Sequence, residues 1–107
     1  MFEKLVPDAL REPQDINHSW LAAVETVTIQ PGQVQTVHTG FRSYVPLLVS
    51  FIQGLGKLDM CALLTTSLID GDEVKVAVLN RGSDPVEIKA GEWLLHVCEL
   101  PLWEPED

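Results

Sequence analysis

The sequence has few positively charged residues. Seven Lys and Arg stand against sixteen Asp and Glu, which gives a formal net charge of −9 at pH 7. The seven cations are scattered along the chain, at Lys4, Arg11, Arg42, Lys57, Lys75, Arg81 and Lys89. Binding to a phosphate backbone needs clustered cations, so the composition argues against a nucleic-acid partner. The acidity either keeps the protein in solution or forms a patch that meets a basic partner or mimics a nucleic acid.

Long hydrophobic runs are also missing. No uninterrupted apolar stretch has the length that a membrane-spanning helix needs, so we expect no membrane partner. The chain begins Met-Phe-Glu-Lys and soon reaches Pro7 and Asp8, which is unlike a secretory signal. We therefore expect a cytoplasmic protein.

Cysteine is scarce, and the chain contains only Cys61 and Cys98. Both lie in apolar, strand-like runs, which favours buried free thiols, and a disulfide would need an oxidising compartment. Neither has a second Cys or a His at zinc spacing, so no metal site is predicted. His96 and Cys98 are two positions apart and would share one face of a strand. Because no third group that would orient the histidine is identifiable, we do not predict a nucleophilic pair.

The histidines do not form a recognisable motif. His18, His38 and His96 lack the close spacing that is typical of metal ligands. Three histidines from distant strands could meet at a trimer axis, but isolated surface or pocket positions are the commoner arrangement.

Length and turn signals predict one small β domain. A chain of 107 residues has the size of one domain, and 46% hydrophobic residues are typical of a globular protein. Glycine, proline and aspartate separate short β-rich segments, which predicts a sandwich or barrel. The expected strands cover residues 24–29, 33–39, 43–52, 58–69, 73–79, 86–88 and 93–100. The clearest is 73–79, where Val74, Val76 and Val78 alternate onto one face.

Proline and local composition set the limits of these elements. Residues 1–19 are interpreted as an extended N-terminal arm with a helical turn near 8–12, residues 20–100 as the barrel, and residues 101–107 as an acidic tail. Pro46 favours an edge position or a bulge in its strand. The apolar run 58–69 could also be a buried helix, but Thr65-Thr66-Ser67 are poor helix formers and favour a strand.

Three stretches carry a resemblance to a known family. They are Val27-Thr28-Ile29-Gln30-Pro31-Gly32 with Val37-His38-Thr39-Gly40-Phe41, then Leu68-Ile69-Asp70 with Glu73-Val74-Lys75-Val76 and Leu79-Asn80, and then Val86-Glu87-Ile88-Lys89-Ala90-Gly91-Glu92. In this order and spacing they resemble the "I-x-P-G … V-x-T-G", "V-I-D … G-E-I-K-V … N" and "I-x-x-G-D-R-I-A-Q-L" patterns of dUTPases. The match covers roughly residues 17–100. The resemblance implies an all-β, distorted jelly-roll β-barrel of the dUTPase-like type. It also implies a three-fold trimer with active sites between subunits and crossing C-terminal segments.

The chain departs from that family where the family binds its substrate. Residues 19–23 lack the aspartate of "A-G-x-D-L", which contributes to the Mg²⁺–phosphate site. Residues 47–52 lack the arginine of the phosphate-binding "R-S-G" motif. The stretch 70–73 is shorter than "D-x-x-Y-R-G-E" and has lost the tyrosine of the uracil pocket. The tail, residues 101–107, has no glycine and three acids where the family has a glycine-rich arm that closes over phosphates.

Three residues remain as weak site candidates. The resemblance implies that Asp70 would orient an attacking water, although an aspartate at a strand end is more often a turn residue. Trp93 stands where the third pattern has arginine, and either packs in a core or interface or stacks on a base or sugar. Trp103, among prolines and acids in the tail, suits an anchor on another subunit or on a partner protein.

Two functions are consistent with this sequence. The first is a non-catalytic accessory protein that uses the dUTPase fold as a homotrimeric protein-interaction scaffold, with a host protein as a further partner. The alternative is a divergent nucleotide-binding protein or pyrophosphatase that uses a cleft between subunits with Asp70 and Trp93. Only this alternative would call for Mg²⁺ as a cofactor. A phage origin is a further hypothesis that no motif supports.

Overall fold

The computed structural model describes residues 2–68 and 71–100. This part of the chain is built from β-strands and one short 3₁₀ helix, η1 (Gly56–Leu58). The strands are β1 (Phe2–Lys4), β2 (Arg11–Pro13), β3 (His18–Ala22), β4 (Val27–Ile29), β5 (Val34–Ser43), β6 (Leu47–Phe51), β7 (Cys61–Leu63), β8 (Ser67–Leu68), β9 (Glu73–Asn80), β10 (Val86–Ile88) and β11 (Trp93–Glu99).

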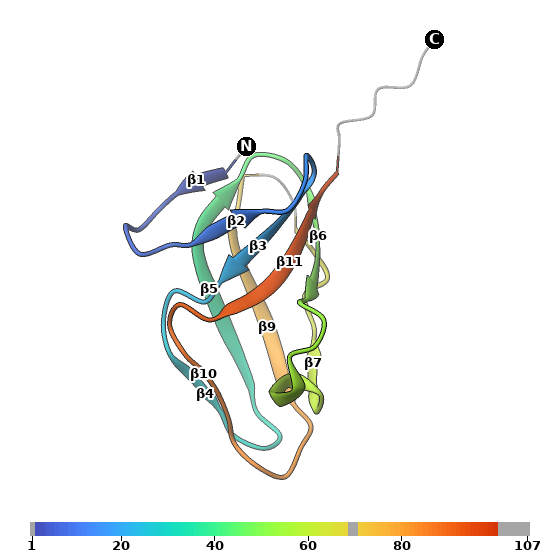
Figure 1. Ribbon diagram of the computed structural model, residues 1–107. Helices are drawn as coiled ribbons and strands as arrows, with labels where there is room; N and C mark the ends of the chain where they lie inside the picture. The colour runs from blue at the N-terminus through green and yellow to red at the C-terminus, as the bar shows by residue number, and fades with distance from the viewer. Residues whose placement is uncertain (1, 69–70, 101–107) are drawn as a thin grey trace.

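The strands form two larger sheets and one small ribbon. One sheet has the order β1-β5-β9-β7, the other has the order β2-β3-β11-β6-β8, and β10 pairs with β4. Every pairing is antiparallel. Figure 1 shows β3, β11 and β6 in front of β5 and β9, with the β4–β10 ribbon at the lower end. The predicted all-β jelly-roll architecture is confirmed.

The core lies between the two larger sheets. In β9 the alternation that the sequence predicts is confirmed, because Val74, Val76 and Val78 are each at most 1% exposed. From the other sheet, Leu95 and Val97 of β11 join the same cluster. Full burial of one such side chain contributes about 1.5–3 kcal/mol, so period-two patterning on facing sheets supplies most of the stabilising surface.

The N-terminal arm is more ordered than the sequence suggested. The helical turn expected near residues 8–12 is wrong, because Arg11–Pro13 form strand β2 on the edge of the five-stranded sheet. Proline lacks a backbone N–H, so it is tolerated at a sheet edge such as Pro13. The last two arm residues, His18 and Ser19, already belong to β3. The arm therefore contributes strands to both larger sheets, since β1 pairs with β5.

The single strand expected at 58–69 is also wrong. The run contains the last residue of η1, then β7 and then β8, and β7 pairs with β9 whereas β8 pairs with β6. The chain therefore crosses from one sheet to the other within this run. Its apolar residues are unevenly buried: Leu58 is 4% exposed, but Met60 and Leu64 are 57% and 52% exposed.

Pro46 lies just before β6, which starts at Leu47 and is an interior strand.

Strand β5 continues past the glycine that was expected to end it. It runs to Ser43, and its register against β9 shifts between His38 and Arg42. Gly40 lies inside this irregularity with φ of 75°. A Cβ there would stand 2.6 Å from Cγ2 of Val6 and 2.9 Å from Cβ of Ala9. Only glycine combines this backbone angle with such close approach of the N-terminal segment.

Among the described residues, no helix has the length and apolar character needed to cross a bilayer.

Candidate functional site

Two of the three site candidates from the sequence, Asp70 and Trp103, lie outside the described residues. The third, Trp93, is half-buried at the start of β11 and is paired with Ala22. Leu68, close to Asp70 in sequence, pairs with Leu47, which in turn pairs with Glu99 at the other end of β11. Six residues of strand separate Trp93 from Glu99, a distance of about 20 Å. Leu68 and Trp93 therefore lie toward opposite ends of the sheet.

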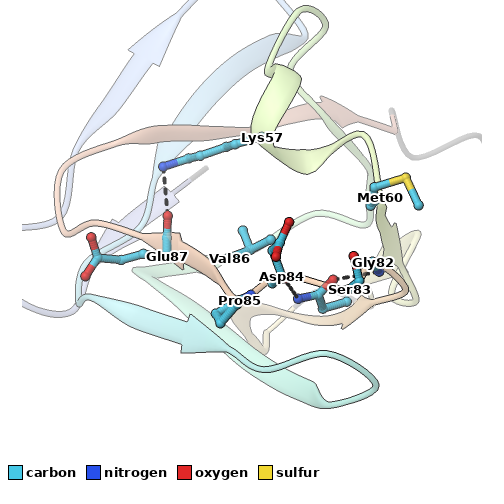
Figure 2. A pocket seen from close by; sticks show the side chains of 9 residues that line it. Lys57, Met60, Gly82, Ser83, Asp84, Pro85, Val86 and Glu87 are labelled. Atoms are coloured by element: carbon cyan, nitrogen blue, oxygen red, sulfur yellow. Dashed lines mark hydrogen bonds between the residues drawn. The ribbon is translucent and has the colours of Figure 1, made fainter.

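A cavity of about 510 Å³ opens at the lower end of the molecule, beside the loop that joins β9 to β10. It is lined by Lys57, Met60, Asn80, Gly82, Ser83, Asp84, Pro85, Val86 and Glu87 (Figure 2). The sequence did not single out this loop beyond its turn residues. Chemically the cavity offers one ammonium group, two acidic residues and the polar backbone of a glycine–serine turn.

Asn80 holds the wall of this cavity in place. Its side chain is fully buried, and its Nδ2 donates to the carbonyl oxygens of Ile29 at 2.9 Å and of Asp84 at 2.8 Å. Its Oδ1 accepts from the Gly82 backbone N–H at 2.9 Å, and its own carbonyl accepts from Gly32 at 2.8 Å. The side chain thus ties the β9–β10 loop to the end of β4, and the Asn80 carbonyl adds a contact to the β4–β5 turn. The geometry explains the asparagine as a structural residue.

Lys57, the cation that lines the cavity, is already hydrogen-bonded to other groups of the chain. Lys57 Nζ donates to the Glu87 carbonyl at 2.8 Å (Figure 2). The same Nζ lies 2.6 Å from Oε1 of Glu92. Partial burial acts to raise the pKa of the Glu92 carboxyl. The Lys57 hydrogen bond, the Lys89 backbone N–H and the charges of both lysines outweigh that effect and lower this pKa. Asp84 also lines the cavity. The combined charge of the cavity residues therefore does not favour binding of a polyphosphate.

The three histidines do not gather at one point. His38 lies 3.1 Å from Oε1 of Glu73 across β5 and β9. His18 and His96, on neighbouring strands β3 and β11, are in direct contact, with Nδ1 of His18 2.9 Å from Nε2 of His96. Cys98 lies beside His18, not beside His96 as the sequence spacing suggested, with 3.8 Å between Sγ and Nε2. Sequence reasoning missed this array because strand register decides which side chains meet.

No arrangement of metal ligands accompanies these groups. Within residues 2–68 and 71–100, no three His, Cys, Asp or Glu side chains are grouped so that they could hold one metal ion. Both cysteines are free; Cys61 is buried and Cys98 is half-buried.

Comparison of this chain with known proteins supports the architecture described above. Two deoxyuridine 5'-triphosphate nucleotidohydrolases, from Desulfitobacterium hafniense strains DCB-2 and Y51, are each 32% identical to it over 88 residues. These matches cover 74% of the chain and 58% of each relative. A dUTPase mutant from phage phi11 of S. aureus superposes with a TM-score of 0.80 at 15% identity, covering 99% of this chain and 92% of that one. The chain belongs to the dUTPase-like family.

Further comparisons of dUTPase-like structures agree on the fold. The dUTPase of Streptococcus mutans has a TM-score of 0.78 at 19% identity, with 99% of this chain and 98% of that chain covered. The dUTPase of Staphylococcus bacteriophage 80alpha has a TM-score of 0.79 at 14% identity, with 99% and 92% covered. At such identities the likeness establishes the dUTPase fold alone. No family model matches the sequence.

The dUTPase relatives in sequence are longer than the matched region. This chain spans a little over half of their length, 58%. Their enzymatic name therefore describes those proteins, and the activity of the present chain is a separate question that its own residues must answer.

Proposed function

We propose that this dUTPase-fold chain is a non-catalytic protein-interaction scaffold that assembles as a homotrimer. One observation carries the proposal: the segments that stand where the family has its metal- and phosphate-binding motifs lack the required acid and arginine. The fold is retained, while the charged groups that would hold a nucleoside triphosphate are not. The following contacts support this interpretation.

Strand β3 replaces the expected acidic motif with packing residues. Ser19 is buried, and its Oγ accepts a hydrogen bond from Nε of Arg11 at 3.1 Å. Its neighbour Leu21 is fully buried in the core, and Trp20 is half-buried on the opposite face of the strand. None of residues 18–22 is acidic, so this strand contributes no carboxylate ligand to a Mg²⁺–phosphate site.

Strand β6 likewise has no phosphate-binding group. Leu47 and Val49 point into the core, and Leu48 and Ser50 alternate onto the exposed face. A uridine triphosphate would need several cationic or N–H donors here, because a desolvated phosphate without such donors is strongly unfavourable. A hydroxyl group from one serine does not replace an arginine that binds two phosphate oxygens at once.

An exposed isoleucine supports the scaffold function. Ile16, between β2 and β3, is 91% exposed. The turn that presents it is held in place, because the Asn17 N–H donates to Oδ1 of Asp15 at 2.9 Å and the Asn17 carbonyl accepts from Glu99 at 2.7 Å. An apolar side chain on an ordered turn is suited to fill a pocket on a partner. We propose that the partner-binding surface includes this turn, with Ile16 and Asp15, together with the acidic tail that carries Trp103.

Assembly into trimers is part of the proposal. A chain of this size buries a limited apolar core, so association with other copies would add stabilising surface. Exposed apolar side chains suited to such contacts include Val34 on β5, at 50%, and Tyr44, at 52%. Light scattering coupled to size exclusion tests this directly: three chains per particle at micromolar concentration is the expected result, and a monomer contradicts it.

The alternative, a divergent nucleotide-binding protein or pyrophosphatase, is favoured by the 32% identity to proteins named as nucleotidohydrolases. It would place the ligand between subunits near Asp70 and Trp93, with Mg²⁺ on the phosphates. Mg²⁺ on a nucleotide is held mainly by phosphate oxygens and water with one or two carboxylates, so this alternative does not need a metal site built from protein side chains alone.

Calorimetry separates the two functions. The full chain is titrated with dUTP, dUMP and the other nucleoside triphosphates, with and without Mg²⁺. The scaffold function predicts no micromolar binding to any of them. The alternative would be established by micromolar dUTP binding that is abolished in Asp70→Ala. The control Asp84→Ala, which changes an acid in the described cavity, would have to leave that binding intact.

Partner capture tests the proposed surface. The immobilised chain is exposed to host lysate. Captured proteins are compared among wild type, Ile16→Ser, Trp103→Ala and the control Ile52→Ser. Ile52 directly follows β6, at the end of that strand away from Leu47. We expect one specific partner that the first two changes weaken and the control retains. Equal capture by all four proteins would contradict a surface at the Ile16 end.

A further inference from the structure

Three side chains with complementary chemistry line up on the outer face of the five-stranded sheet. They are His18 on β3 and His96 and Cys98 on β11. Cys98 is paired with His18 and His96 with Trp20 in the register of these two strands. The sheet face that carries them is opposite to the core, since Val97 between them is fully buried. His18 is 78 residues from His96 and 80 residues from Cys98 in sequence, and it meets them only because β3 and β11 are neighbours.

The array is a chain of contacts through one imidazole. His18 contacts Cys98 with Nε2, at 3.8 Å from Sγ, and contacts His96 with Nδ1, at 2.9 Å from Nε2. The two rings are nearly parallel, with 17° between their planes and 4.8 Å between centroids. A hydrogen bond between two ring nitrogens needs one proton between them, on either ring. The middle histidine is thereby fixed in orientation.

This geometry supports proton transfer from the thiol. When the Cys98 proton moves to Nε2 of His18, the imidazolium carries N–H groups on both nitrogens. The His18 Nδ1–H then donates to Nε2 of His96, which accepts it as a neutral ring. A thiol, a base and a group that orients the base are the parts that activate a cysteine nucleophile. His18 is therefore the base and His96 the positioning residue.

The second cysteine of the chain provides a contrast. Cys61 is 7% exposed, and burial raises the pKa of its thiol, an effect that the Arg81 charge opposes only in part. Cys98 is half-buried on the outer face, next to Leu48, which pairs with it on β6 and is 48% exposed. A thiol in an apolar site is inert, whereas a partly exposed thiol beside an imidazole is the kind that reacts.

We propose that Cys98 is a modification site for small hydroperoxides, activated by His18 and positioned by His96. The Cys98 proton passes to His18, and the thiolate attacks the terminal peroxide oxygen. An S–O bond forms as the O–O bond breaks, and the leaving oxygen takes the proton from His18. Sulfur is oxidised by two electrons to a sulfenic acid, and the hydroperoxide is reduced to water or an alcohol. The hydroperoxide is the only co-reactant.

The size of the reactant follows from the surroundings. A cavity of about 330 Å³ lies next to this array and is lined by His96 and Trp20 with residues 50–53, but not by Cys98. The thiol therefore meets reactants at the sheet surface. Hydrogen peroxide and short alkyl hydroperoxides need no binding pocket, which is why we assign this class.

Two reagents measure the reactivity of the full-length native chain. Iodoacetamide reports nucleophilicity, and hydrogen peroxide with a dimedone trap reports sulfenic acid formation. Mass spectrometry of peptides gives separate rates for Cys98 and Cys61. Because His18 can take the thiol proton as a general base, we expect a rate gain of about tenfold for Cys98. The reference is the same Cys98 in the chain unfolded by urea.

Histidine variants test the roles. His18→Phe and His96→Phe retain a ring but remove its nitrogens, and each is expected to reduce the Cys98 rate by about fivefold to tenfold. His96→Gln keeps a polar group near Nδ1 of His18 and is expected to restore part of the rate. His38→Gln, far from the array, is the matched control. Slow labelling of Cys61 verifies that each variant is folded.

Three results would overturn the proposal. Cys98 could react no faster in the native chain than in the unfolded one, a comparison that needs no variant. The rate could be the same in His18→Phe as in wild type while Cys61 remains protected. Rapid alkylation without dimedone-trapped sulfenic acid would remove the hydroperoxide assignment.

Discussion

The side-chain amide of Asn80 donates to the carbonyl oxygen of Ile29, 51 residues earlier in the chain, at a distance of 2.9 Å. The same NH₂ group reaches the Asp84 carbonyl at 2.8 Å, and Oδ1 accepts from Gly82. Both donors and the acceptor of one fully buried amide are therefore satisfied by backbone groups of β4 and of the β9–β10 loop. The amide links the lower end of the barrel to the cavity loop.

Replacing Asn80 with alanine should destabilise the chain substantially. The change leaves backbone groups of Ile29, Asp84 and Gly82 without their partner, and each buried unsatisfied group costs about 1–3 kcal/mol. Relaxation and water entry reduce the sum, so we expect a loss of about 2–4 kcal/mol. Urea unfolding monitored by tryptophan fluorescence measures it. The control Asn17→Ala, at an exposed position, should change the unfolding free energy by less than about 0.5 kcal/mol.

Two glycines with similar backbone angles should respond differently to alanine. Gly40 has φ of 75° and Gly32 has φ of 78°, but a Cβ meets Val6 at 2.6 Å only at Gly40 and has open space at Gly32. Gly32→Ala should cost about 1–2 kcal/mol from backbone strain alone. Gly40→Ala adds overpacking of about 1–3 kcal/mol. Equal losses in thermal or urea unfolding would show that the N-terminal segment does not pack on Gly40.

The Lys57–Glu92 pair should make stability depend on pH in the acid range. The pKa of Glu92 is lowered in the folded chain, so the carboxylate stabilises folding at pH values above its unfolded pKa. That contribution is lost as pH falls through the folded pKa. The side chains are 40% and 30% exposed, so solvent screening limits the pair to about 0.5–1 kcal/mol. Unfolding of wild type and Glu92→Gln between pH 7 and 3 should give curves that converge toward acid.

A control at an exposed acid sharpens this test. Glu25 is exposed, so Glu25→Gln should run parallel to wild type over the same pH range. If Glu92→Gln and Glu25→Gln behave alike, the contact between Lys57 and Glu92 contributes nothing measurable to folding.

The sequence predicted elements where one local pattern decides the structure. The alternation of Val74, Val76 and Val78 was sufficient for β9, because a strand with one buried face must place every second residue inward. The run 58–69 was not predictable in this way. Apolar composition does not reveal that β7 and β8 belong to different sheets, since the crossing is fixed by the pairing of Leu63 with Val78 and of Leu68 with Leu47.

The same limit applied to the side-chain array. The spacing of His96 and Cys98 placed both on one face, which is correct, but no nucleophilic pair was predicted, and His18 was not identified as the group beside the thiol. His18 reaches Cys98 only through the register of β3 against β11. The sequence indicates that register only indirectly, through the family that it resembles. In addition, His18 had been assigned to the N-terminal arm, outside the barrel.

Turnover of dUTP tests the central claim of a dUTPase fold without dUTPase chemistry most directly. The purified full-length chain is incubated with dUTP and Mg²⁺, and pyrophosphate release is followed at enzyme concentrations high enough to detect a few turnovers per hour. We expect release no faster than in buffer, for wild type and for Asp70→Ala alike. Steady release of pyrophosphate that Asp70→Ala abolishes, in a chain that remains folded, would contradict it.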